Sequence, residues 1–295
     1  MRAEQPSVRR DVLLFAFGAA VWLAVQIATW PAALSFGDEV GYMGQSRALL
    51  AGHVRPLPED PGHWVEGDHG RVGKYPLFLP LIAAPICALT PRLVFGIGIA
   101  SALALAGVAA CLLRLWGRSP VWGLLLLAHP TVVMISRTLM VDVMLSAFTV
   151  GAWYALARDR RVLASVLTAL VVLAKPTGIL IAGALIAGEA VRLYPTLPRR
   201  RLLGWLATMG IGIVGAAALA AVLNVISTGT PRYGYSQEDV GAPLFSLAHI
   251  PHRLPWHAAG LLLCPPLVVV GALSLWRRRA FGPLAAVIGL VAAMC

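Results

Sequence analysis

The amino-acid sequence predicts an all-α protein, a polytopic helical membrane bundle whose long first outer loop carries short interfacial helices. Two observations support this fold class. Hydrophobic residues fill 59% of the 295 positions and charged residues only 13%, roughly half of the ~25% that is usual in soluble domains. At least seven stretches of the chain approach the roughly 20 apolar residues that one membrane-spanning helix needs. A surface with so few charges suits lipid rather than water.

The elements follow in order from the apolar runs. The first predicted helix covers residues 12–33, and no small-residue cleavage site closes it, so we expect a retained helix rather than a signal peptide. A polar segment, the first outer loop, covers residues 34–76. The next apolar piece, 77–89, is short for a span and interrupted by prolines, so we expect it to be half-inserted. Further helices are predicted at 93–116, 119–136, 139–157, 162–175, 176–191, 202–226, 255–276 and 281–295.

The net charge of +11 reports the orientation of the chain rather than binding to nucleic acid. With the helices above, fifteen cations and four acids fall on the side of the N-terminus, and the other side is neutral. Cytoplasmic loops collect arginine and lysine in this way. Treating 77–89 as a full span would scatter the arginine clusters over both sides. The sequence therefore predicts a cytoplasmic N-terminus in a bacterial inner membrane, with the long loops on the outer side.

The first outer loop begins with two adjacent carboxylates. Asp38 is a good N-cap, and Glu39 suits the positive end of the helix that follows. We expect Gly52 to end that helix and one of its faces to lie on the membrane interface; that face consists of Tyr42, Ser46, Leu49 and Leu50. Asp38 is either a simple cap or a general base placed beside a lipid-borne substrate.

Other polar residues on the outer side leave two interpretations open. Lys74 and Tyr75 are either interface anchors or ligands of a lipid phosphate. Arg137 and Asp142 either form an ion pair or belong to a site, because ionisable residues near spans are often functional. Tyr235, in the second large outer loop at 227–254, either lines an acceptor groove or anchors the interface.

Cofactor signals in the sequence are weak, and no cofactor is predicted with certainty. The outer histidines include His53, and a cluster in the first outer loop contains two histidines and two carboxylates, a ligand set that suits a divalent metal. No ligand spacing supports a metal, so solvated loop residues are the favoured interpretation. The run Gly210–Gly215 matches GxGxxG, but no strand precedes it, so we interpret its small residues as helix-packing positions.

Taken together, these elements resemble the GT-C superfamily of membrane glycosyltransferases, which includes the protein O-mannosyltransferases and the aminoarabinose transferases. The resemblance covers nearly the whole chain in order. The residues that carry it are Gly37-Asp38-Glu39, Tyr42, Ala48-Leu49, Gly52, Lys74-Tyr75-Pro76-Leu77, Pro130, Ser136-Arg137, Asp142, Lys175-Pro176, Gly229-Thr230-Pro231 and Gly234-Tyr235. Members usually continue beyond this length. We therefore expect residues 1–295 to be a single transmembrane domain, truncated at its C-terminus.

The resemblance implies inverting transfer of a sugar from a polyprenyl phosphate to a protein, lipid or glycan acceptor on the outer face. In that scheme Asp38 is the general base and Glu39 supports it. The donor phosphate would contact Lys74, Tyr75, Arg137 and Lys175, and supporting roles would fall to Asp142, His53 and Tyr235. Two rival functions stay open. A secondary transporter or lipid flippase would need ionisable residues at mid-bilayer, and a scaffold protein would tolerate loss of Asp38.

Overall fold

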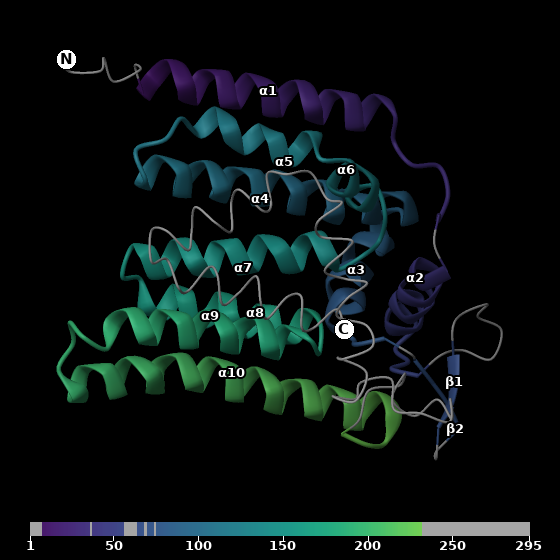
Figure 1. Ribbon diagram of the computed structural model, residues 1–295. Coiled ribbons are helices and arrows are strands. Elements are labelled where there is room, and N and C mark those ends of the chain that lie inside the picture. The colour runs from purple at the N-terminus through teal and green to yellow at the C-terminus, as the bar shows by residue number, and fades with distance from the viewer. Residues whose placement is uncertain (1–7, 36, 56–63, 68–69, 74, 232–295) are drawn as a thin grey trace, which may run out of the picture.

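The computed structural model describes residues 8–35, 37–55, 64–67, 70–73 and 75–231 of the chain. These residues form a predominantly helical bundle in which the long helices run side by side, parallel or antiparallel (Figure 1). Within the described residues, three helices are long and apolar enough to cross a membrane: α1 (Val8–Ala28), α4 (Phe95–Leu115) with the 3-10 turn η1 (Pro91–Val94) before it, and α10 (Arg199–Thr228). The predicted helices at 255–276 and 281–295 lie outside the described residues.

Helices α7 to α9, which precede α10, are shorter. They are α7 (Asp142–Ala157, 16 residues), α8 (Arg161–Ala174, 14 residues) and α9 (Gly178–Leu193, 16 residues). At 1.5 Å per residue, α7 rises about 24 Å and α8 about 21 Å. Their positions agree with the sequence prediction to within a few residues.

The predicted single helix at 119–136 is wrong, because the chain forms three pieces there. They are the 3-10 turn η2 (Pro120–Gly123), α5 (Leu124–Ala128) and α6 (Pro130–Ser136). The break lies at His129, whose backbone is extended at φ −68° and ψ 126°. Pro130 has no N–H to continue the helical ladder and disfavours helical geometry in the residue before it.

Arginines gather at one end of the bundle, at the left in Figure 1, where α1, α8 and α10 begin and α4, α7 and α9 end. Among the described residues this arginine-rich end has eleven arginines and three acids. The arginines are Arg9, Arg10, Arg114, Arg118, Arg158, Arg160, Arg161, Arg192, Arg199, Arg200 and Arg201. The separation of charge that the sequence predicts is therefore present in the arrangement of the helices.

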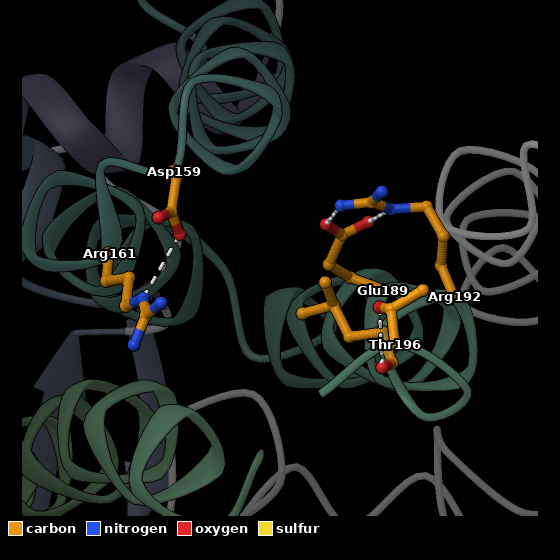
Figure 2. A network of polar contacts seen from close by, with 6 residues as sticks. Asp159, Arg161, Glu189, Arg192 and Thr196 are labelled. Atoms are coloured by element: carbon orange, nitrogen blue, oxygen red, sulfur yellow. Dashed lines mark hydrogen bonds and ion pairs between the residues drawn. The ribbon is translucent and has the colours of Figure 1, made fainter. Parts of the chain in front are cut away.

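Two of the three acids at the arginine-rich end are paired with arginines (Figure 2). Asp159 accepts from Arg161 Nε at 3.1 Å. Glu189 is 7% exposed and accepts from two nitrogens of Arg192, with Nε at 2.9 Å. These two acids are thus paired with nearby arginines, and the arginines at this end outnumber the acids.

The opposite end of the bundle, at the right in Figure 1, is covered by α2 (Gly37–Leu50), α3 (Phe78–Leu89) and a small hairpin. The hairpin pairs β1 (Trp64–Gly67) with β2 (Gly70–Gly73) in antiparallel register. The sequence predicts only loop and short helices there, so the hairpin corrects that prediction. We call this end the α2–α3 end.

Helix α2 ends where expected but does not present the expected face. Gly52 has a φ of +78°, and the His53 N–H donates to the Ala48 carbonyl at 2.8 Å, the bond of a Schellman cap. Tyr42 is 6% exposed and Ser46 fully buried, because α2 packs on α3. Leu49 is half-buried and Leu50 is exposed. The prediction that this face lies on the membrane interface is therefore wrong for Tyr42 and Ser46, which lie on the protein-facing side of the helix.

Helix α3 matches the predicted piece at 77–89 and is too short to span. Its twelve residues rise about 18 Å, and it runs across the ends of the long helices rather than along them (Figure 1). One buried cluster joins α2 and α3 to the bundle through Met43, Leu79, Met144, Val171 and Ile181. Apolar packing therefore holds the α2–α3 layer in place.

One of the three glycines in the GxGxxG match, Gly212, lies at a close contact between two helices. A Cβ at Gly212 in α10 would overlap the side chain and the carbonyl of Ser165 in α8, whereas Gly210 and Gly215 have open space around them. The Ser165 hydroxyl donates to the Thr208 carbonyl at 2.7 Å. The packing interpretation is thus confirmed at Gly212.

Gly98 in α4 lies against the chain that leaves α6, where a Cβ would overlap the Ser136 carbonyl and come within 3.0 Å of the Thr138 carbonyl. Gly98→Ala is therefore expected to destabilise the protein by about 1–3 kcal/mol, the usual cost of forcing extra volume into a packed site. Gly107→Ala is the matched control, because Gly107 lies in the same helix with nothing within 4 Å. Melting temperatures in detergent would test this, and equal melting temperatures for the two variants would contradict it.

Candidate functional site

Asp38 is held at the α2–α3 end by a tyrosine from a distant part of the chain. It is the second residue of α2, not the residue before it, and is half-buried. The Tyr75 hydroxyl donates to Asp38 Oδ1 at 2.5 Å. The first turn of a helix also favours negative charge. Asp38 is therefore an oriented carboxylate with part of its surface accessible.

Two tyrosines connect Asp38 to a second carboxylate. The rings of Tyr42 and Tyr75 lie 4.8 Å apart between centroids. The pKa of Tyr42 is raised well above its ordinary value, first by burial and then by the negative charges of Asp142 and Asp38. Tyr42 also lies in one buried cluster with Val141 and Met144. Packing therefore brings α2 close to the start of α7.

Asp142 is the first residue of α7 and forms an ion pair with Lys175, with Lys175 Nζ 2.9 Å from Asp142 Oδ1. Lys175 follows α8 in extended conformation and precedes Pro176. The two side chains are 42% and 43% exposed, with Lys175 the slightly more open. An ammonium has three donors, so Lys175 can hold Asp142 and still bind an anion.

Glu39 is fully buried, in contrast to its neighbour Asp38. Its Oε2 accepts the backbone N–H of Ser35 at 2.5 Å, and its Oε1 accepts the backbone N–H of Leu139 at 2.6 Å. Leu139 lies in the segment between α6 and α7, a hundred residues further along the chain. No local pattern in the sequence could have indicated this contact.

Arg137 does not form the pair with Asp142 that the sequence left open. Its guanidinium donates to Gln26 Oε1 at 3.0 Å, to Thr29 Oγ1 at 2.7 Å and to the Thr29 carbonyl, all at the end of α1. There the positive charge of the guanidinium lies at the negative end of the helix dipole, which favours cations. It also lines a cavity of about 570 Å³ together with Pro31, Ala32, Ala33, Ser35, Met134 and Thr138.

Of the other residues singled out from the sequence, His53 does not join the Asp38 site. His53 is exposed and follows the far end of α2, about 20 Å from Asp38 along the helix axis. Lys74 and Tyr235 lie outside the described residues. Tyr75, expected at a donor phosphate, is hydrogen-bonded to Asp38. Tyr42, which the sequence predicts on a membrane-facing surface, is buried against the ring of Tyr75.

The described residues contain no group of three histidine, cysteine or acidic side chains arranged to hold a metal ion. The histidine and carboxylate cluster considered from the sequence, His63, Glu66, Asp68 and His69, lies in a region where the structure describes only the β1 backbone at Glu66. The groups that converge are therefore two carboxylates, two phenols and one ammonium. Such a set can accept a proton and bind an anion.

No protein-family model matches the chain, and no curated protein or solved structure matches it either.

Proposed function

We propose that this chain is a membrane glycosyltransferase that moves a sugar from a polyprenyl phosphate to an acceptor hydroxyl, with inversion at the anomeric carbon. The observation that carries the proposal is that two polar pairs, Asp38 with Tyr75 and Asp142 with Lys175, lie at the α2–α3 end around one buried cluster. This end lies opposite the arginine-rich end and beside apolar helices. The resemblance of the sequence to the GT-C superfamily supports the same reaction.

The proposed setting is a bacterial inner membrane, with the arginine-rich end in the cytoplasm. Three apolar helices of sufficient length support a membrane location, and the excess of arginine at one end supports the orientation. The α2–α3 end would then meet the lipid headgroups of the outer, periplasmic leaflet. The sugar and phosphate of a polyprenyl-linked donor would lie at the depth of these headgroups.

In the proposed reaction the accessible carboxylate of Asp38 takes the proton of the acceptor hydroxyl. The acceptor oxygen forms a bond to the anomeric carbon while the bond from that carbon to the phosphate oxygen breaks on the opposite face. The bonding electron pair leaves with the polyprenyl phosphate, and the proton stays on Asp38 until solvent removes it. The Tyr75 hydroxyl keeps Asp38 oriented during this step.

The leaving phosphate gains negative charge, which a nearby cation stabilises more in the transition state than in the ground state. Lys175 is the described cation that fits this role, because it is half-exposed and already fixed by Asp142. Lys74, adjacent to Tyr75 in the sequence, belongs to the same proposal. Arg137 is a weaker candidate than the sequence indicated, since its guanidinium already binds the end of α1.

The rival function of a secondary transporter or flippase has less support. Transport through a bundle uses ionisable residues near mid-bilayer. In α1, α4 and α10, as far as they are described, every Asp, Glu, Lys and Arg lies in the first or last turn. The acids of the candidate site likewise lie at helix starts. This distribution favours chemistry at the membrane surface.

Membranes that contain the protein, supplied with a panel of labelled polyprenyl-phosphate hexoses and pentoses, would test the proposal. We expect loss of one lipid-linked sugar and an equal gain of polyprenyl phosphate, in wild type but not in an Asp38→Asn variant. Movement of intact labelled lipid between leaflets without cleavage, measured in proteoliposomes, would replace the proposal by the flippase function. Equal cleavage by both proteins would remove Asp38 from the reaction.

A further inference from the structure

We propose that Glu39 is a positioning residue, which fixes the distance between Asp38 and Asp142 by joining the start of α2 to the segment before α7. The inference rests on the proposed glycosyl transfer. It specifies how Glu39 would support Asp38. Asp38 would act on the substrate, and Glu39 would act through the backbone N–H groups that it binds.

The burial of Glu39 supports this assignment. The side chain has no exposed surface, so a substrate reaches it only if α2 moves away. A buried carboxylate is costly unless its oxygens are hydrogen-bonded. Both oxygens of Glu39 accept backbone N–H groups, from Ser35 at 2.5 Å and from Leu139 at 2.6 Å. Hydrogen bonds to an ionised acceptor are among the strong ones in proteins.

The two backbone donors lie on different parts of the site. Ser35 precedes α2 and therefore Asp38, while Leu139 lies three residues before Asp142. Leu139 and Val141 are almost completely buried. Packing therefore holds the segment that leads into α7 in place. The hydrogen bonds of Glu39 thus join the start of α2 to the segment before α7. The negative charges of both aspartates raise the pKa of the Tyr42 phenol.

The shape of the carboxylate makes glutamate difficult to replace. Glutamine has one accepting oxygen, and its amide group would point an N–H at one of the two backbone donors. Aspartate keeps both oxygens but is one methylene shorter, so it cannot span the same two N–H groups. Both Glu39→Gln and Glu39→Asp should therefore loosen the contact. An acid–base residue would behave differently, since aspartate would retain part of its activity and glutamine none.

The test combines amide hydrogen exchange with steady-state kinetics on the full chain in lipid nanodiscs. In Glu39→Gln and Glu39→Asp we expect faster exchange in the peptide that contains the Leu139 amide. We also expect kcat to fall by about tenfold to a hundredfold, the effect of a small misplacement of catalytic groups. The donor KM should stay within about twofold, because the groups proposed to bind the donor are unchanged.

Glu189→Gln is the matched control, because Glu189 is also a buried acid but lies at the arginine-rich end beside Arg192 (Figure 2). We expect wild-type kcat and wild-type exchange around Leu139 in this variant. Unchanged Leu139 exchange in the Glu39 variants would overturn the proposal. Wild-type kcat in Glu39→Asp with loss in Glu39→Gln would overturn it as well, in favour of an acid–base role. A wild-type protein that transfers no sugar would refute the glycosyl transfer, while the exchange measurement would still decide whether Glu39 holds the two segments together.

Discussion

Asp38→Asn is expected to lower the rate of sugar transfer by about 10²–10⁴-fold, the contribution of a positioned general base. The amide has the size of the carboxylate, and its oxygen can still accept from the Tyr75 hydroxyl, which donates at 2.5 Å in the wild type. The fold around α2 should therefore persist while the proton acceptor is lost. The measurement is the initial rate at which the labelled lipid-linked sugar disappears, with matched amounts of protein in the membranes.

The control for this variant is again Glu189→Gln, which removes a buried carboxylate far from the α2–α3 end. Its rate should equal that of the wild type. A rate within threefold of wild type for Asp38→Asn would contradict the assignment of Asp38 as base. Acceptors with a more acidic hydroxyl should recover part of the lost rate, because they need less help in losing their proton.

Lys175→Gln is the second substitution with a large expected effect, a fall of about 10²-fold in kcat/KM for the donor. The reason is electrostatic: one preorganised donor aimed at developing charge is typically worth a factor of this size. The ion pair with Asp142 is nearly half-exposed on both sides, and pairs of this kind contribute only about 0–1 kcal/mol to stability. Stability therefore cannot account for a hundredfold loss. Kinetics and melting temperature, measured on the same preparation, separate the two effects.

Asp142→Asn is the matched variant, since it removes the same ion pair but leaves the ammonium of Lys175 in place. We expect a loss of less than about tenfold, because the lysine can still bind the phosphate although it is less well fixed. Equal losses in the two variants would mean that the pair serves only to hold α7 against the chain before α9. In that case Lys175 would have no direct part in donor binding.

The apolar pattern predicted most of the helices because each one satisfies its own backbone hydrogen bonds and needs no information from elsewhere. Helices α1, α4 and α10 lie within a few residues of the predicted ranges, and Gly52 ends α2 as expected. The break before Pro130 was missed although the proline itself was visible. The residues on both sides of the break are apolar, so the whole stretch has the length of one membrane span. The prediction followed this length rather than the helix-breaking effect of the proline.

The site was predictable only in part, because its contacts join residues that are far apart in the sequence. Asp38 was identified from its place at the start of a helix, which is a local feature. The contact of Asp38 with Tyr75 depends on how α2 packs on α3, and the contact of Glu39 with Leu139 depends on how α2 lies against the segment before α7. The face of Tyr42 and Ser46 has the same helical spacing whether it covers lipid or protein. Periodicity alone could not choose between these two environments.

The short lengths of α8 and α9 have a consequence for the bilayer itself, because both helices have exposed apolar side chains. In the proposed membrane setting, these helices of about 21–24 Å face a hydrocarbon layer roughly 30 Å thick. Lipids beside these helices would have to compress their chains by several ångströms, at a cost of a fraction of a kcal/mol per ångström. The resulting dimple would lower the headgroup layer toward Asp142 and Lys175. Hydrophobic mismatch would thereby bring the phosphate of a lipid-linked substrate closer to these two residues. The protein would also favour thin bilayers over thick ones.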